Sequence, residues 1–307
     1  MAEISTISTA FVQQYSDMLY PLSQQQKSKF AMNVRQESCQ GESKSFDRLG
    51  EATIEEITTR HPATPNNEQP HSRRWVTPTN HHTNSLIDNA DKLKMIIDPT
   101  NEYAQNQARA MGRQMDDTII TAALGTAAAG VTATTSSIAF KDESVSINGD
   151  GTITTLGTLA AVTTIVNITL AKVATMGRLF SEADIDEEIP LFWAITPKDV
   201  SDMLNLAVFT SSDYVDLRPL RTGKIVNYLG FNFVMSNRLT KDAVGSTGYR
   251  TFAWAQDGII YASAEGITTR MSERDDLSYT AQVYSRMNGG AVRMDGDKVH
   301  ECLNKVA

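Results

Sequence analysis

The sequence predicts an α+β fold, and three observations predict it. A long polar segment is followed by one strongly helical stretch, and short strands are interleaved irregularly with helices over the remainder. The chain has 307 residues, of which 41% are apolar and 21% charged. This is enough for one large domain or two smaller ones.

The polar segment, residues 36–83, contains four prolines and few large apolar side chains. Ordering a backbone costs roughly 1–2 kcal/mol per residue, whereas burying one large apolar side chain returns roughly 1.5–3 kcal/mol. The segment therefore cannot form a core of its own. It is either disordered or ordered on a surface that something else supplies.

An ordered form of this segment would be a long hairpin. Residues 46–50 and 73–77 have strand character, and residues 60–70 between them are rich in turn formers. A two-stranded hairpin alone is marginal in water, so we expect it to lie on a neighbour. Arg73 and Arg74 beside Trp75 suit carboxylates on another subunit. Nucleic acid is the competing partner, and the net charge of −8 favours the subunit.

A long helix is predicted over residues 99–125. Asp98 is a good N-cap, Pro99 suits the first helical position, and Gly125 is a natural stop. Apolar residues recur at spacings of three and four. The predicted packing stripe is Ala104, Ala108, Met111, Met115, Ile119 and Ala122.

The remainder alternates between strands and helices. A hairpin is expected at 144–154 and helices at 156–176 and from Pro197 to about residue 206. Strands are expected at 191–195, 224–228, 231–236, 250–255, 258–262, 268–284 (with a polar break near 274–276) and 291–294.

No motif for chemistry emerges. The sequence lacks a phosphate-binding loop, a dinucleotide-binding turn and a nucleophile elbow. We therefore expect no catalytic residue, no cofactor and no metal site, and no apolar run is long enough to cross a membrane. The two cysteines, Cys39 and Cys302, are expected to be reduced thiols.

The order of these elements resembles the major capsid protein of tailed bacteriophages, whose fold is shared with encapsulin nanocompartments. Short motifs carry the resemblance over nearly the whole chain: residues 11–26, Phe46-Asp47-Arg48-Leu49-Gly50, Thr59-Arg60, His71-Ser72-Arg73-Arg74, Ile87-Asp88-Asn89-Ala90-Asp91, Arg113-Gln114-Met115-Asp116-Asp117, Gly230-Phe231, Ser236-Asn237 and Gly289-Gly290-Ala291-Val292-Arg293.

The resemblance implies a division of the chain. Residues 1–35 would be an N-terminal arm and 36–83 an extended loop. A peripheral domain would comprise 84–125, with the spine helix at 99–125, and 263–290. An axial domain would comprise 126–262 and 291–307. The candidate intersubunit contacts are Arg48, Arg60, Arg73, Arg74 and Trp75.

The resemblance also implies partners. Copies of the chain would form hexamers and pentamers in an icosahedral shell that encloses double-stranded DNA without sequence-specific binding. We expect assembly in the host bacterial cytoplasm, a separate scaffolding protein, a portal, a possible cement or decoration protein, and localisation to the virion. No membrane partner and no covalent cross-link between subunits are expected.

Two alternatives remain open from the sequence. The first is an encapsulin-like shell that encloses cargo proteins. The second is a soluble α+β enzyme with residues 36–83 as a mobile lid. Uniform closed particles would exclude the enzyme, and the enclosed material would separate the two shells.

Overall fold

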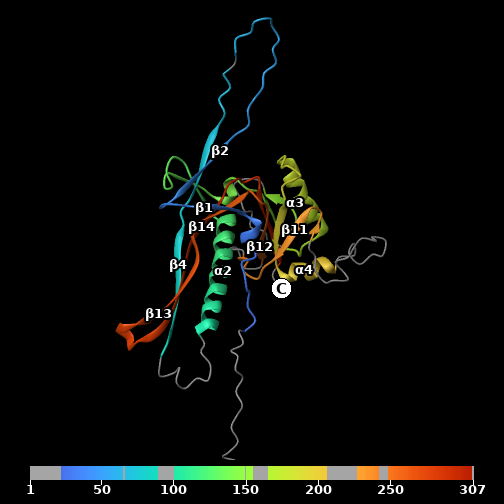
Figure 1. Cartoon of the computed structure of the whole chain (residues 1–307). Helices are drawn as coiled ribbons and strands as arrows, with labels where there is room; N and C mark the ends of the chain where they lie inside the picture. Colours follow the sequence, from blue (N-terminus) through green and yellow to red (C-terminus); the bar gives the residue numbers. More distant parts are fainter. Residues whose placement is uncertain are drawn as a thin grey trace, which may run out of the picture.

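The computed structural model describes residues 22–64, 66–88, 100–148, 150–154, 165–205, 227–241 and 248–305. Within them, the strands form one seven-stranded sheet and two four-stranded sheets, accompanied by three α-helices (Figure 1). The predicted α+β class is confirmed. The predicted helix cap at Asp98 and Pro99, and most of the predicted N-terminal arm, lie outside the described residues.

The seven-stranded sheet has the order β10-β11-β9-β12-β15-β7-β8. Its strands are β7 (Ser146–Ile147), β8 (Ile153–Thr154), β9 (Leu191–Ile195), β10 (Asn227–Tyr228), β11 (Phe231–Met235), β12 (Gly248–Ala255) and β15 (Val299–Lys305). Helix α3 (Leu170–Glu182) packs on it through Val173, Met176 and Phe180. The predicted hairpin at 144–154 and the strand at 191–195 are confirmed.

Residues 156–164 of the helix predicted over 156–176 lie outside the described residues, and α3 begins at Leu170, later than that pattern predicts. Residues 165–169 are not helical, and Thr169 caps the helix by accepting a hydrogen bond from the backbone of Lys172 at 3.3 Å. Ile165 and Val166 are β-branched, which lowers helix propensity, and a Thr side chain competes well as an N-cap. Helix α4 (Pro197–Leu204) begins as predicted, with a Thr196–Asp199 capping box.

A four-stranded sheet, ordered β1-β13-β14-β4, carries the long helix on one face. Its elements are β1 (Arg35–Ser38), β4 (Thr79–Ile87), β13 (Ile259–Arg274), β14 (Thr280–Arg293) and α2 (Thr100–Leu124). The polar break predicted near 274–276 is present, but the other strand boundaries predicted after residue 257 are wrong. Strand β13 continues through residues 263–267 with register shifts, and the polar residues at 275–277 form a 3-10 turn (η4, Asp275–Leu277) between two strands.

The third sheet has the order β2-β3-β5-β6. Its strands are β2 (Lys44–Leu49), β3 (His71–Val76), β5 (Ala127–Ala129) and β6 (Ser136–Ile138), and two further 3-10 turns are η2 (Ala31–Asn33) and η3 (Phe140–Asp142). Strands β2 and β3 pair antiparallel from Lys44–Val76 to Leu49–His71. The predicted hairpin is therefore present, and it is joined to the body through β5.

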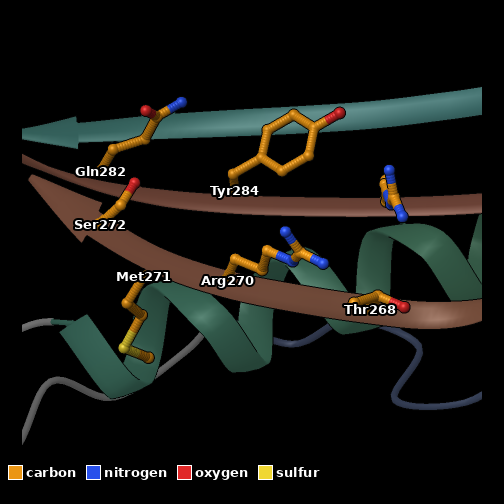
Figure 2. Close-up of a pocket in the computed structure, with 7 residues that line it drawn as sticks. Thr268, Arg270, Met271, Ser272, Gln282 and Tyr284 are labelled. Atoms are coloured by element: carbon orange, nitrogen blue, oxygen red, sulfur yellow. The ribbon is translucent and has the colours of Figure 1, made fainter. Parts of the chain in front are cut away.

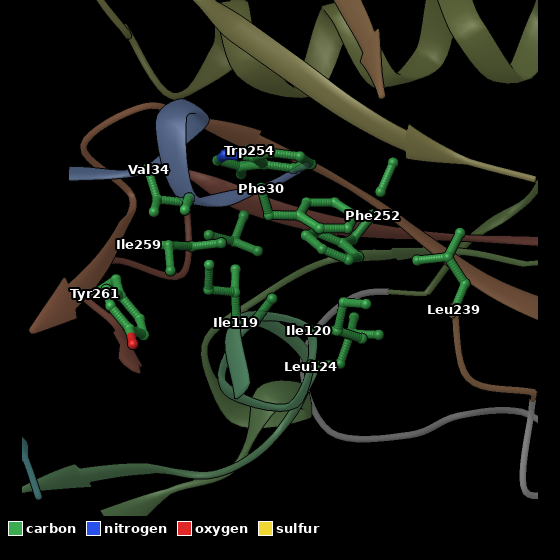
Figure 3. Packing of buried hydrophobic residues seen from close by; sticks show 14 of the residues in the cluster. Phe30, Val34, Ile119, Ile120, Leu124, Leu239, Phe252, Trp254, Ile259 and Tyr261 are labelled. Atoms are coloured by element: carbon green, nitrogen blue, oxygen red, sulfur yellow. The ribbon is translucent and has the colours of Figure 1, made fainter. Parts of the chain in front are cut away.

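An aromatic core joins the seven-stranded sheet to the sheet β1-β13-β14-β4 (Figure 3). Phe30 packs against both Phe252 and Trp254, with ring centroids 6.1 and 5.7 Å away. Ile119 and Ile120 of α2 pack against the same cluster. Because burying an aromatic ring removes a large apolar area from water, this cluster anchors the C-terminal half of α2.

The long helix is confirmed, and its buried face is more polar than the predicted stripe. Met111 and Ile119 of the stripe are buried, while Ala104, Ala108, Met115 and Ala122 are half-buried. The helix also buries Gln107, whose amide donates to the Val283 carbonyl at 3.0 Å, and Asp116, and these two residues lie on opposite sides of the stripe. A search for apolar periodicity passes over both residues because they are polar.

Asp116 fixes the segment before β1 onto the helix. Its carboxylate, which has no exposed surface, accepts hydrogen bonds from the Ser28 hydroxyl at 2.5 Å and from the backbone of Lys29 and Phe30 at 3.1 and 3.2 Å. Gly112, one turn earlier, permits this approach, because a Cβ there would lie 3.1 Å from the Ser28 nitrogen. A glycine inside a helix costs about 1 kcal/mol relative to alanine, and here the close packing of the segment at Ser28 offsets that cost.

We predict that Asp116→Ala lowers the free energy of unfolding of the soluble subunit by about 3 kcal/mol, because several buried donors lose a charged acceptor. Chemical denaturation followed by circular dichroism measures the change. Asp117→Ala is the matched control: its ion pair with Arg238 is one-third exposed and should contribute less than about 1 kcal/mol. Equal losses for the two variants would contradict this account of Asp116.

Candidate assembly interface

An extended loop, residues 51–70, projects from the end of the β2–β3 hairpin (Figure 1). The hairpin closes with a hydrogen bond from the Gly50 nitrogen to the Pro70 carbonyl at 2.8 Å. Beyond it, every described residue of the loop is exposed, including 95% of Ile54 and 76% of Ile57. A polar strip of chain is thus held away from the body with its few apolar groups in water.

The loop leaves the body through a rigid base. Across the hairpin, Arg73 makes a two-pronged ion pair with Asp47, which lowers the pKa of that exposed carboxyl. Its guanidinium carbon also lies 5.7 Å from the Trp75 ring centroid. The Trp75 indole donates to the Gly130 carbonyl at 2.9 Å, which ties β3 to the turn after β5.

Beneath this base lies a buried ion cluster around Glu143, which follows η3. Glu143 pairs with Arg74 of β3, with Arg48 of β2 at 3.0 Å and with Arg293 of β14 at 3.5 Å. Arg74 and Arg293 expose 1% and 0% of their surfaces. Burial lowers the pKa of both guanidiniums and Glu143 opposes that shift, so the carboxylate is their compensating charge.

Arg293 also caps the long helix. Its guanidinium donates to the carbonyls of Ala123 and Gly125 at 3.0 and 2.9 Å, where α2 ends. A cation is favourable there because the helix dipole is negative at its C-terminus and the last carbonyls lack intrahelical partners. The guanidinium lies 5.0 Å from the Phe140 ring centroid as well. One cluster therefore connects the loop base, the end of α2 and the end of β14.

The five candidate contact residues fall into different places. Arg60 is exposed in the loop, and Arg73 and Trp75 are partly exposed on the hairpin. Arg48 reaches inward to Glu143 and, at 3.6 Å, to Asp295. Arg74 is buried in its own subunit, so we no longer assign it to an intersubunit contact. Arg74 does not face a neighbour because its guanidinium pairs with Glu143 of the same chain. The sequence alone does not reveal this internal partner.

Sequence reasoning missed Glu143, and gave Arg293 no role. Both residues lie in segments whose sequence indicates only turns and strands. The role of each residue is visible only in the folded chain, where β14, η3 and the end of α2 lie together. Among the described residues, no group of three or more His, Cys, Asp or Glu side chains could hold a metal ion. No helix in the described ranges is both long and apolar enough to cross a membrane.

We predict that Glu143→Gln destabilises the soluble subunit by about 3–5 kcal/mol, because it leaves two buried guanidiniums without a compensating charge. Thermal or chemical unfolding measures the loss. Asp276→Asn, which breaks an ion pair more than one-third exposed on both sides, is the control and should leave stability almost unchanged, because exposed ion pairs contribute little. A near-neutral Glu143→Gln variant would exclude the cluster as a main stabiliser of the base.

Several solved structures have a similar fold. The chain is similar to the capsid asymmetric unit of cyanophage Pam1 (TM-score 0.76, 16% identity, 100% of both chains covered) and to the capsid of cyanophage P-SCSP1u (TM-score 0.73, 14% identity, 96% of this chain and 93% of that one). It is also similar to the capsid of Ralstonia phage GP4 (TM-score 0.70, 11% identity, 100% and 98%). These likenesses define the phage capsid fold.

The family model described as "Phage capsid protein" matches residues 7–306. The chain therefore belongs to the phage capsid protein family. A comparison with curated proteins gave no match. With the family and fold together, the protein is a major capsid protein: a structural subunit of a virion shell rather than an enzyme.

Proposed function

We propose that copies of this chain assemble as hexamers and pentamers into an icosahedral shell around double-stranded DNA, and that the extended loop holds neighbouring copies together. The observation that carries the proposal is the loop itself. The described residues of this loop, 51–64 and 66–70, are all exposed on the isolated chain, and the loop rises from a base fixed by the ion pair of Arg74 with Glu143. A segment that buries nothing on its own subunit can offset the entropy cost of its ordering by burying surface on a neighbouring subunit.

We further propose the domain division that the resemblance implies. The sheet β1-β13-β14-β4 with α2 fits a peripheral domain, and the seven-stranded sheet fits an axial domain that includes β15. Four proposed boundaries fall inside strands. They are 35/36 in β1, 83/84 in β4, 262/263 in β13 and 290/291 in β14, so these limits are positions along continuous strands rather than linkers.

The proposed contents and partners follow from charge and family. A net charge of −8 suits a shell that encloses DNA without gripping it. A separate scaffolding protein, a portal, a possible decoration protein and assembly in the host cytoplasm complete the proposal. Arg48, Arg60, Arg73 and Trp75 remain the candidate intersubunit contacts, because part of each side chain is accessible to a neighbour.

We predict that replacing residues 51–69 by Asn-Gly abolishes closed shells while the subunit stays folded. Gly50 and Pro70 are already hydrogen-bonded across the hairpin, so a two-residue turn can close it. Negative-stain microscopy of the wild-type chain and the variant, expressed side by side, measures assembly. Circular dichroism verifies the fold. Normal shells from the shortened chain would refute the role of the loop.

The enclosed material tests the rest. Shells purified from the producing phage should protect double-stranded DNA from nuclease. Protein cargo without DNA would instead support an encapsulin-like compartment. A wild-type chain that stays a small globular monomer under all conditions would contradict both shells.

A further inference from the structure

We propose that a groove between α3 and β11 binds a basic, aliphatic segment of a protein other than this chain. The groove has a volume of about 560 Å³. This α3–β11 groove is defined by Gly177, Phe180, Ile185, Ile189, Leu229 and Phe231, with Asp186 and Glu187 beside them. The inference goes beyond the proposed shell function, because it concerns a binding surface of the single subunit.

The floor of the α3–β11 groove is apolar and belongs to the core. Figure 1 shows α3 beside β11 on the seven-stranded sheet. Phe180 and Phe231 are buried and touch edge to face, with ring centroids 5.7 Å apart. Ile185 and Ile189, in the connection from α3 to β9, are half-buried. A partner side chain placed in the groove therefore meets aromatic and aliphatic surface.

One wall of the groove carries a leucine that its own subunit does not favour. Strands β10 and β11 pair Tyr228 with Phe231, which leaves Leu229 and Gly230 as a two-residue turn. Both turn residues have positive φ, 49° and 82°. This is the pattern of a type I′ turn, which prefers Asn-Gly, whereas a left-handed backbone is unfavourable for leucine. Leu229 is also 53% exposed, so neither the backbone nor burial explains it.

Gly177 is a second residue of the groove that the isolated subunit does not require. A glycine inside a helix is less stable than an alanine. A Cβ at position 177 would come no closer than 3.9 Å to the Phe231 ring, which is an ordinary contact. Two locally unfavourable residues thus line one groove. Such departures from local preference are expected where a protein binds a partner.

The rim of the groove is acidic. Residues 182–188 contain five carboxylates, all of them exposed. Arg178 pairs with Glu182 at 3.5 Å, whereas Asp186 and Glu187 make no ion pair with any residue that the structure describes. Exposed carboxylates beside an apolar groove are complementary to a segment in which Lys or Arg adjoins an aliphatic side chain.

The hollow on β13 and β14 has the opposite charge. It measures about 430 Å³, and Figure 2 shows Arg270 and Tyr284 among its side chains. The residues that line it include Arg286 as well and no carboxylate. A basic segment therefore finds complementary charge at the α3–β11 groove and not at this hollow.

The extended loop and the N-terminal residues of a second copy carry the wrong charge for this groove. Residues 51–70 contain four glutamates and one arginine. Residues 1–21 contain two acidic residues and neither Lys nor Arg. Like charges placed together oppose association, and the whole chain has a net charge of −8. The occupant is therefore a separate protein that presents a basic amphipathic segment.

A labelled amphipathic peptide made only of leucine and lysine tests the groove, with binding to the purified full-length chain followed by fluorescence anisotropy. Leu229→Asn should weaken binding at least about tenfold, equivalent to about 1.4 kcal/mol. It should also raise Tm, because Asn-Gly suits the turn. Leu86→Asn, at a leucine 47% exposed on β4, is the matched control and should bind like the wild type. Equal binding by the two variants, or no binding by the wild type, would overturn the proposal.

Charge reversal provides an independent test. Asp186→Lys combined with Glu187→Lys should also weaken binding of the peptide at least about tenfold. Glu42→Lys combined with Glu273→Lys changes the net charge equally at two exposed positions elsewhere and should weaken binding far less. Equal losses for the two double variants would mean that the peptide senses only net charge, which contradicts a specific site.

Stability and self-assembly distinguish the remaining explanations. Gly177→Ala should raise Tm and weaken peptide binding several-fold. If Gly177→Ala and Leu229→Asn both lower Tm, these residues serve their own subunit and the proposal fails. If Leu229→Asn keeps its fold but abolishes self-assembly of the purified chain, a second copy occupies the groove and the proposal fails as well. The peptide assay requires no shells, so its outcome is independent of the proposed shell function.

Discussion

The rest of this subunit depends on the ion pairs of Glu143, whose side chain is only 14% exposed. Glu143 compensates Arg74 from the loop base and Arg293 from β14, and Arg293 in turn caps α2. Three segments far apart in the sequence are therefore positioned by one charge. Such a cluster is costly to desolvate and costly to break, which makes the geometry at this junction well defined rather than adjustable.

A second fixed point lies halfway along the same helix. Asp116 binds the backbone of residues 29 and 30, and this brings Phe30 into the aromatic core with Phe252 and Trp254. The long helix is thus held at its middle by the N-terminal segment and at its end by Arg293. The charged residues that hold the helix have partners within the subunit. The charged side chains of the extended loop are instead exposed to solvent.

The sequence predicted the features that follow from local chemistry. The long helix, the capped helix at Pro197, the hairpin strands and the shortage of apolar groups in the loop all depend on neighbouring residues. The start of α3 was misplaced because Thr169 acts as a cap inside an apolar pattern. Strands β13 and β14 were divided wrongly because their continuity depends on pairing with each other and with β4. Arg74 was assigned outward because its partner, Glu143, is 69 positions away, and no spacing rule links them.

The proposed role of the extended loop has a geometric consequence. A loop that binds a different surface on the next copy makes a heterologous contact, in which the two copies use different surfaces. A heterologous contact does not by itself fix the number of copies in the assembly. The copies close into a ring only when the rotation from one copy to the next divides a full turn, and otherwise they continue as an open helix. The direction in which the hairpin leaves the body sets that rotation, so the angle fixed by Glu143 would decide whether copies of this chain close into rings or continue without end.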